Sequence, residues 1–313
     1  MSLGISAASF LLLVGCVTPL TPSEALETEV RELIDGYRGD IGVYAKNLRT
    51  TETFSYHGDD LFCTASVFKV PVMVELFRQA ERGEVNLRDR RTPSTKASMH
   101  GTGILSYLQD APELSLLDYC RLMIVYSDNI ATDTIMETID PAAVTATMER
   151  LGLSKTRVNG NVTQMHYGMM GSDAVTGSAE LDEQLMDAAR SGGLVLGGFA
   201  NRSLSGNVTT PREMGILLEK LHLGEVVSRL ASESMLDVMK DTRSSSMIPK
   251  HLPSGTVVAH KTGGTWRVKA NVGIAYLESG PVVISVFAFY EPEEKRAAEI
   301  LAEIARLIAD WAQ

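Results

Sequence analysis

Ser66 and Lys69 are the residues in this chain whose types and spacing most clearly suggest covalent chemistry. A serine hydroxyl and a lysine amine three residues apart on a helix share one face, so the amine can take the hydroxyl proton. Apolar residues recur at helical spacing over residues 67–80, which predicts a helix with Ser66 in its first turn. The unpaired backbone N–H groups of a first turn favour developing negative charge. The same spacing occurs in helices without chemistry, so the pair alone assigns no function.

Two further short motifs carry polar side chains at predicted element boundaries. Ser127-Asp128-Asn129 lies at a corner between the predicted helical runs 114–126 and 130–139. These three residue types also serve as ordinary helix caps. Lys261-Thr262-Gly263 follows a predicted strand at residues 256–260, where a cation beside a hydroxyl suits a planar anion.

The helices and strands expected around these motifs indicate an α/β (α+β) fold. A capping box at Thr21 and Glu24, with Pro22 at the first helical position, opens an N-terminal helix. A hairpin follows, then a mainly helical middle, three strands and a closing amphipathic helix. We expect an antiparallel five-stranded sheet flanked by the N- and C-terminal helices, with an all-helical domain inserted. The predicted ranges are 1–20 for a signal-like segment, 21–65 with 246–313 for the sheet domain, 66–245 for the helical domain, 41–48, 53–56, 256–260, 271–277 and 282–289 for the strands, and 292–312 for the last helix.

Composition excludes several classes of function. The 313 residues are 44% hydrophobic and 22% charged, as in ordinary soluble domains. A net charge of −10 argues against nucleic acid as a partner, because phosphate binding requires a basic face. The six histidines show no paired ligand spacing, so we expect no metal and no cofactor. A small-molecule substrate and a monomer are the expectation.

The N-terminal segment predicts export. Residues 5–20 are mostly apolar and contain Leu13-Val14-Gly15-Cys16, which resembles a bacterial lipobox. A lipidated Cys16 would anchor the protein to a membrane and place it in the periplasm or on the outer surface. No Lys or Arg precedes Arg31, so the basic start of a signal peptide is missing, and a disordered apolar N-terminus is the alternative. The other two cysteines, Cys63 and Cys120, either meet or remain buried thiols.

Together, the motifs resemble the set found in class A β-lactamases and penicillin-binding proteins: Ser66-x-x-Lys69, Ser127-Asp128-Asn129 and Lys261-Thr262-Gly263 occur in the order of that family. The segments 65–71, 101–105, 126–129 and 209–211 also look like their counterparts there. The resemblance covers about residues 24–312.

The resemblance implies an acyl-enzyme mechanism. Ser66 would be the nucleophile, and Lys69 its base or proton relay, provided that burial and the second cation Lys261 lower its pKa. Ser127 would hand a proton to the leaving nitrogen. The backbone N–H groups of Ser66 and Gly264 would form the oxyanion hole.

Other residues would hold the substrate. Asn129 would bind an amide of the substrate side chain, and Lys261 with Thr262 would bind the carboxylate shared by β-lactams and peptidoglycan stem peptides. Arg267 and Lys269 either add charge nearby or are solvated strand residues.

One part of the family pattern is missing. Class A enzymes carry a glutamate about 35 residues after the asparagine of the second motif, and this carboxylate activates the deacylating water. The corresponding residues 157–164 include no carboxylate. A longer segment follows, in which residues 180–189 read as an acidic surface helix, whereas Glu213 reads as part of a second capping box. The candidates to replace the glutamate are His166, Asp173, Glu180, Asp182 and Glu183.

Three functions remain open on this basis. The first is a β-lactamase that opens β-lactam amides through a Ser66 acyl-enzyme. The second is a D-alanyl peptide or ester hydrolase of the same fold. The third is a slowly deacylating penicillin-binding protein or lactam sensor. The family resemblance favours the first, and the missing glutamate favours the second and the third.

Overall fold

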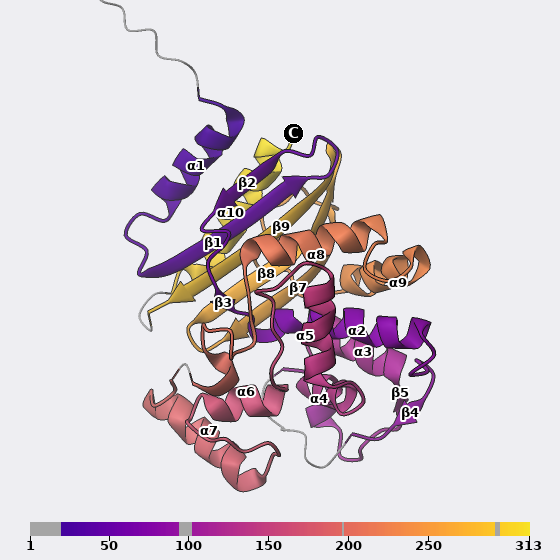
Figure 1. Cartoon of the computed structure of the whole chain (residues 1–313). Coiled ribbons are helices and arrows are strands. Elements are labelled where there is room, and N and C mark those ends of the chain that lie inside the picture. Colours follow the sequence, from indigo (N-terminus) through magenta and orange to yellow (C-terminus); the bar gives the residue numbers. More distant parts are fainter. Residues whose placement is uncertain (1–19, 94–101, 196, 292–294) are drawn as a thin grey trace, which may run out of the picture.

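The computed structural model describes residues 20–93, 102–195, 197–291 and 295–313, and a five-stranded antiparallel sheet forms its centre (Figure 1). The strand order is β2-β1-β9-β8-β7, so the two ends of the chain build one sheet. Long apolar runs fill β8 and β9, as expected for strands covered on both faces. The strands are β1 Gly39–Asn47, β2 Thr53–Tyr56, β7 Val257–Thr265, β8 Val268–Leu277 and β9 Gly280–Tyr290.

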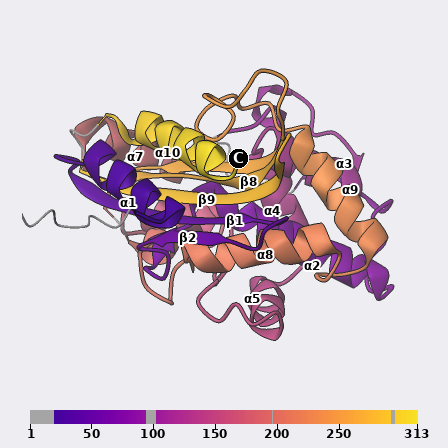
Figure 2. The same ribbon diagram turned by 90° about the horizontal axis from the view of Figure 1, so that it is seen from above.

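Two terminal helices cover one face of the sheet, as Figure 2 shows from above. Helix α1, Pro22–Leu33, begins with the predicted capping box: Thr21 Oγ1 accepts from Glu24 N at 3.3 Å, and the Glu24 carboxylate accepts from Thr21 N at 2.8 Å. Helix α10, Ala297–Trp311, turns its apolar face onto β8 and β9. The prediction of a mixed fold with a five-stranded sheet and flanking helices is confirmed.

The opposite face of the sheet carries α8, Pro211–Leu223, and beyond it the helical part of the molecule (Figure 1). Thr210 caps α8 by accepting from Glu213 N at 3.0 Å. The capping box predicted here is wrong in its second half, because the Glu213 carboxylate accepts from Lys155 N and Thr156 Oγ1 instead. The other helices are α2 Lys69–Glu81, α3 Leu116–Val125, α4 Asn129–Met136, α5 Pro141–Arg150, α6 Val162–Gly168, α7 Ala179–Ser191 and α9 Arg229–Lys240.

Short elements join the helices. They are the 3₁₀ turns η1 Ala65–Phe68, η2 Leu105–Tyr107 and η3 Gly198–Ala200, the strand pair β3 Phe62–Cys63 with β6 Val208–Thr209, and the pair β4 Arg90–Arg91 with β5 Leu114–Ser115.

Several predicted boundaries are wrong. The helix expected at residues 67–80 starts as the 3₁₀ turn η1, and the α-helix begins only at Lys69. Ala65, at φ +42°, sets this tight entry. The motif Lys261-Thr262-Gly263 does not follow a strand but lies inside β7, which runs on to Thr265. The last helix begins at Ala297; residues 292–294, where we placed its start, lie outside the described residues.

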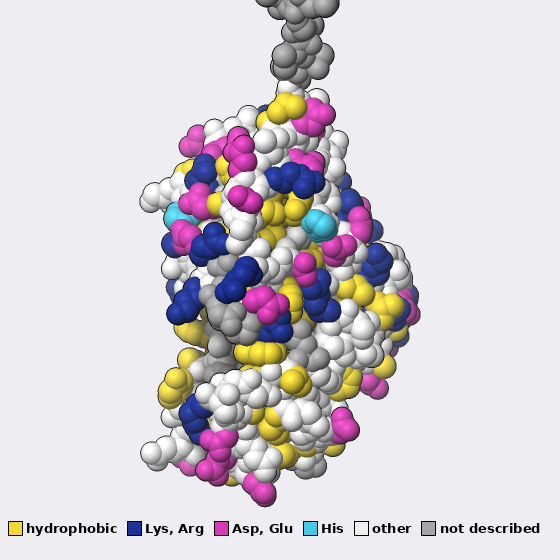
Figure 3. Space-filling view, turned by 90° about the vertical axis from the view of Figure 1, so that its left-hand side faces the viewer, with side chains coloured by type: hydrophobic (Ala, Val, Ile, Leu, Met, Phe, Trp, Pro, Cys, Tyr) yellow, Lys and Arg dark blue, Asp and Glu magenta, His cyan; other side chains and the backbone are white. Residues whose placement is uncertain are grey.

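The structure also bears on the expectations for the cysteines, a membrane span, the surface charge and the domains. Cys63 and Cys120 are both buried and free, which settles the alternative in favour of thiols. In the described ranges, no helix combines the length and apolarity needed to cross a membrane. On the face shown in Figure 3, basic and acidic side chains are interspersed. The division into a sheet domain and an inserted helical domain stays a prediction.

Candidate active site

Close packing between η1 and the edge strand β7 places Ser66 beside the Lys261 motif. Gly263 makes this approach possible, since a Cβ atom there would lie 2.8 Å from the carbonyl oxygen of Thr64 and 3.0 Å from the Val67 side chain. Ser66 itself is half-buried, between neighbours that are fully buried. The close approach of β7 at Gly263 therefore positions the turn that carries Ser66.

A strained turn presents Ser127. Its φ of +55° is a left-handed conformation, rare for a residue with a Cβ atom. The buried carboxylate of Asp128 holds this turn by accepting from Ala131 N at 2.9 Å, and from Ile104 N and Leu105 N at 2.7 and 2.9 Å. Asp128 is thus the N-cap of α4 and also fixes the neighbouring loop. The cap that the sequence suggested is real, and it serves to orient the serine.

Two buried lysines converge on Ser127. Lys69 Nζ donates to the Ser127 carbonyl oxygen at 2.8 Å, to Ser127 Oγ at 3.3 Å and to Asn129 Oδ1 at 2.8 Å. Lys261 Nζ donates to Ser127 Oγ at 3.0 Å and to the Thr262 carbonyl oxygen at 2.8 Å. Both lysines are completely buried. The structure therefore brings four of the predicted site residues into one hydrogen-bonded cluster.

Burial changes the acidity of both amines. Burial lowers the pKa of Lys69 to about 7, although the nearby carboxylates of Asp133 and Asp128 oppose the shift. Burial also lowers the pKa of Lys261 well below its ordinary value, and the charge of Lys69 adds to this effect. An amine that is half neutral near pH 7 can accept a proton from a serine.

Asp133 is a part of the site that the sequence reasoning missed. It lies one helical turn after Asn129 on α4, and it is buried. Its carboxylate accepts from Val162 N at 2.8 Å, from Thr163 N at 3.1 Å and from Thr163 Oγ1 at 2.6 Å, which ties the start of α6 to α4. Burial raises the pKa of Asp133, while the Thr163 and Val162 hydrogen bonds and the charge of Lys69 oppose the rise. Its four-residue spacing from Asn129 was the available signal.

The remaining predicted site residues lie along β7. Thr262 is half-buried, and Gly264 is exposed beside the ammonium of Lys269, which would be 3.2 Å from a Cβ atom at this glycine. Arg267, at the hairpin after β7, is occupied elsewhere: Nε donates to the Tyr290 carbonyl oxygen at 3.1 Å and Nη2 to Glu291 at 2.6 Å. Lys269 is therefore the nearer of the two extra cations.

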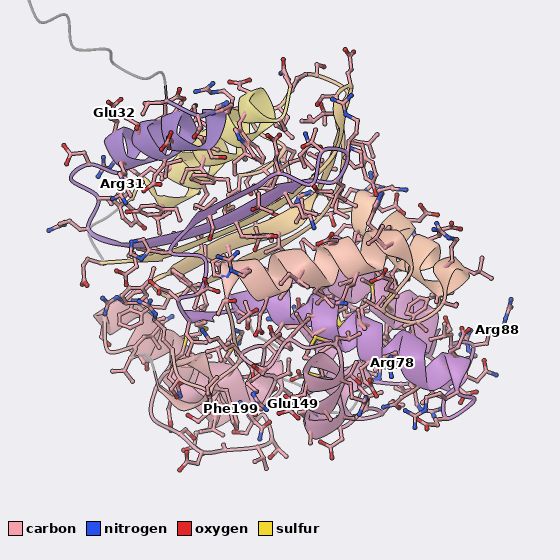
Figure 4. All side chains as sticks on the ribbon, turned by 45° about the horizontal axis from the view of Figure 1, so that its top comes forward. Arg31, Glu32, Arg78, Arg88, Glu149 and Phe199 are labelled. Atoms are coloured by element: carbon pink, nitrogen blue, oxygen red, sulfur yellow. The ribbon has the colours of Figure 1, made fainter. Side chains whose placement is uncertain are left out.

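In the region that corresponds to the missing glutamate, amide side chains add hydrogen bonds to those of Asp133. Asn159 Nδ2 donates to the carbonyl oxygens of Leu204 and Gly206 at 3.0 and 2.7 Å, and Asn161 with Gln164 forms a capping box at the start of α6. Phe199, labelled in Figure 4, packs so closely on this stretch that a Cβ atom at Gly160 would lie 2.2 Å from its ring.

The acidic residues of the longer segment divide into two kinds. Asp173, Glu180 and Glu183 are exposed, and the last two lie on α7, so the predicted acidic surface helix exists. The interpretation is wrong for Asp182, which is buried and accepts from the hydroxyl of Tyr167 at 2.5 Å. Asp182 therefore anchors α7 to α6. The other predicted replacement, His166, is half-buried on α6.

A group of three side chains of the kinds that bind metal ions lies beside α10, far from these residues in the fold. His251, Glu299 and Glu303 bring their ligand atoms within 4.8 Å of one another. Lys250 pairs with Glu299, and Arg306 pairs with Glu303 at 2.8 Å, so the carboxylates already have cationic partners. This arrangement is an ion-pair network at the surface.

Comparisons with known proteins agree with the geometry. The family model described as "Beta-lactamase enzyme family" matches residues 25–312. Beta-lactamase 3 of Bacillus cereus is 22% identical over 279 residues, covering 88% of this chain and 77% of the relative. The imipenem-hydrolyzing beta-lactamase of Enterobacter cloacae is 24% identical over 289 residues, covering 90% of this chain and 88% of the relative.

Solved structures share the fold. PBP-A superposes with a TM-score of 0.75 at 23% identity, over 94% of this chain and 97% of PBP-A. A mutant of PBP-A, solved as an acyl-enzyme complex with penicillin G, gives a TM-score of 0.73 at 23% identity, over 94% of this chain and 98% of that one. With its family model matched over nearly the whole length, this chain belongs to the beta-lactamase enzyme family.

Proposed function

We propose that this protein is a serine hydrolase that opens β-lactam amides through an acyl-enzyme on Ser66. The observation that carries the proposal is the convergence of two buried amines, Lys69 and Lys261, on the hydroxyl of Ser127, close to the turn that bears Ser66. Burying two amines is costly unless they are neutral or well paired, so such a cluster favours proton transfer over a purely structural role.

The proposed acylation conserves protons at each step. Neutral Lys69 takes the proton of Ser66, and Ser66 Oγ attacks the lactam carbonyl carbon. The backbone N–H groups of Ser66 and Gly264 stabilise the oxyanion. As the carbon–nitrogen bond breaks, Ser127 gives its hydroxyl proton to the leaving nitrogen, and Lys69 returns a proton to Ser127 over the 3.3 Å contact.

The residues around this proton relay orient the substrate. Lys261 and Thr262 bind the substrate carboxylate, whose negative charge favours the protonated form of Lys261. Asn129 accepts from Lys69 through Oδ1, and in this proposal its side chain also binds an amide of the substrate side chain.

A second function, slow turnover as a penicillin-binding protein or lactam sensor, is favoured by one specific observation. Residues 157–164 contain no carboxylate, and Asn159, Asn161 and Thr163 are committed to structural hydrogen bonds. Without a general base for the deacylating water, hydrolysis loses a factor of about 10²–10⁴. A D-alanyl peptide or ester is the alternative substrate class for the same acylating groups.

Burst kinetics with one chromogenic lactam separate these functions. We expect about one equivalent of lactam to open rapidly, followed by slow turnover, and we expect Ser66→Ala to abolish both phases. Fast linear turnover without a burst would contradict slow deacylation. Single substitutions at His166, Asp173, Glu180, Asp182 and Glu183 would then identify the replacement base, since its loss alone should make the acyl-enzyme accumulate.

We further propose that the protein is exported, anchored through a lipidated Cys16 and monomeric. Cys16 lies outside the described residues, so the support is its lipobox-like sequence context alone. Fractionation of the full-length gene product in its own host tests this proposal. A soluble cytoplasmic protein with residue 1 intact would contradict it.

A further inference from the structure

A buried carboxylate lies against the stretch of chain in which the family glutamate is missing. A glutamate about 35 residues after Asn129 would fall at Thr163 or Gln164, at the start of α6. Both positions carry neutral side chains. The Asp133 carboxylate reaches the same place from α4, since its oxygens accept from Val162 N at 2.8 Å and from Thr163 N at 3.1 Å. A negative charge is therefore supplied here by a helix on the other side of the contact.

This carboxylate belongs to the Lys69 side of the site. Asn129, one helical turn before Asp133 on α4, accepts from Lys69 Nζ at 2.8 Å. Residues four apart on a helix share a face, so Asn129 and Asp133 lie on the same side of α4. Among the charges that act on the pKa of Lys69, that of Asp133 has the larger effect and that of Asp128 the smaller. Lys69 itself follows Ser66, the residue that would carry the acyl group, by three positions.

The two carboxylates near Lys69 differ in the groups that they bind. The Asp128 carboxylate accepts from three backbone N–H groups, which donate but do not accept. The Asp133 carboxylate accepts in addition from the Thr163 hydroxyl, at 2.6 Å. This distance is typical of a hydroxyl that donates to an ionised carboxylate. A hydroxyl oxygen can take up one proton while it gives another away, so Thr163 is able to relay a proton to Asp133.

We propose that Asp133 is the general base of deacylation and that it acts through the hydroxyl of Thr163. The inference rests on the proposed function, because it requires the acyl-enzyme on Ser66. It assigns to this chain a carboxylate that takes over the role of the missing glutamate from α4. Since this carboxylate does not meet the water directly, we expect the relay to sustain the slow turnover described above and not a fast one.

The hydrolysis conserves protons at each step. A water molecule attacks the ester carbonyl carbon of the acyl-enzyme, and its proton passes to Thr163 Oγ1 as the Thr163 proton passes to Asp133 Oδ2. The backbone N–H groups of Ser66 and Gly264 stabilise the oxyanion. When the bond between the carbonyl carbon and Ser66 Oγ breaks, the proton returns through Thr163 to Ser66 Oγ. The product leaves as a carboxylic acid and releases its own proton to solvent.

Rapid mixing with a chromogenic lactam separates deacylation from acylation. The burst reports acylation of Ser66, and the slow phase that follows reports deacylation. The measurement is made at about pH 8, where Lys69 is largely neutral both in the wild type and in Asp133→Asn. We expect Thr163→Val and Asp133→Asn to keep the burst and to slow the later phase at least about ten-fold, because a general base contributes about 10²–10⁴ to such a step.

Three comparisons distinguish a proton relay from a structural role. Thr163→Ser keeps the hydroxyl, so it should deacylate within about two-fold of the wild type. Asn161→Ala removes the cap of α6, where Oδ1 accepts from Gln164 N at 2.8 Å, and keeps both groups of the relay; its deacylation should change as little. Hydroxylamine attacks an ester without help from a base. It should therefore release the acyl group from Thr163→Val and from the wild type at equal rates.

The possible outcomes separate this inference from the proposed function. A burst followed by a slow phase that either Thr163→Val or Asp133→Asn leaves unchanged overturns the relay alone. The relay is also overturned if Thr163→Ser or Asn161→Ala deacylates as slowly as Thr163→Val, or if release by hydroxylamine falls with hydrolysis. A wild type that forms no acyl-enzyme overturns the proposed function and the relay together. If the wild type turns over without a burst, Thr163→Val must make the acyl-enzyme accumulate, and continued linear turnover overturns the relay.

Discussion

Replacing Asp133 by asparagine should move the pH dependence of acylation toward acid. The Asp133 carboxylate favours the protonated form of Lys69, so it holds the pKa of this amine up against the effect of burial. Asparagine keeps the shape and one acceptor for the Val162 and Thr163 donors but removes the charge. With the charge gone, the Lys69 pKa falls, and its neutral form becomes available at lower pH.

The magnitude follows from the distance of one helical turn. Lys69 Nζ contacts the side chain of Asn129, and Asp133 lies one turn after Asn129 on α4. Taking this one-turn spacing of about 6 Å as the separation of the two charges, their interaction at an effective dielectric near 20 is about 3 kcal/mol. The Asp133 carboxylate also accepts hydrogen bonds from Val162 and Thr163, which screen its charge, so we expect a shift of about one pKa unit. From a wild-type value of about 7, the variant reaches about 6, which makes acylation at pH 6 about five-fold faster.

The assay is the acylation rate from stopped-flow mixing with a chromogenic lactam between pH 5 and 9, values chosen to bracket the Lys69 pKa. Rates of wild type and Asp133→Asn should coincide above pH 8, where Lys69 is neutral in both. Thr163→Val is the control, since it weakens the anchor of α6 to Asp133 and keeps the charge. A midpoint that stays in place in Asp133→Asn, or that moves equally in Thr163→Val, would refute the electrostatic role.

Two further predictions concern residues of β7. Lys261→Ala should lower kcat/KM about ten-fold more for a carboxylate-bearing lactam than for its methyl ester, as charge-assisted hydrogen bonds of this strength imply. Equal losses would contradict carboxylate binding by Lys261 and leave it a structural role through its hydrogen bonds to Ser127 and Thr262. Burial lowers the pKa of His260 from 6.5 to about 4, so the folded state binds fewer protons than the unfolded state in this window. The free energy of unfolding should therefore fall by about 3 kcal/mol as pH drops through the window, and His260→Asn should remove this part of the slope. An unchanged slope in His260→Asn would show that the imidazole is not buried in the neutral form.

Local patterns were enough to predict the sheet and most helices. The apolar runs of β8 and β9 and the capping box at Thr21 depend on near neighbours in the chain, and these elements appeared where expected. The entry to α2 was missed because its 3₁₀ turn depends on packing against β7, which is almost two hundred residues away.

The site residues that belong to the family motifs could be predicted from the sequence, and the others could not. Lys69, Ser127 and Lys261 were named from spacing, but their convergence on a single hydroxyl depends on three separate segments of the fold. Asp133 belongs to no motif, and only its tertiary contacts with Val162 and Thr163 show its relation to the site. The buried Asp182 looked like any surface acid in a helix first turn, because its partner Tyr167 lies on another helix.

The mass of the intact protein after mixing with a penicillin tests the central claim most directly. We expect the wild type to gain the mass of one whole penicillin within seconds, to keep it for minutes, and to carry it on the peptide that contains Ser66. Ser66→Ala should show no adduct, while Ser106→Ala, a serine of η2, should behave as the wild type. An adduct that persists in Ser66→Ala, or its absence from the wild type, would contradict the assignment of Ser66 as the acylated nucleophile.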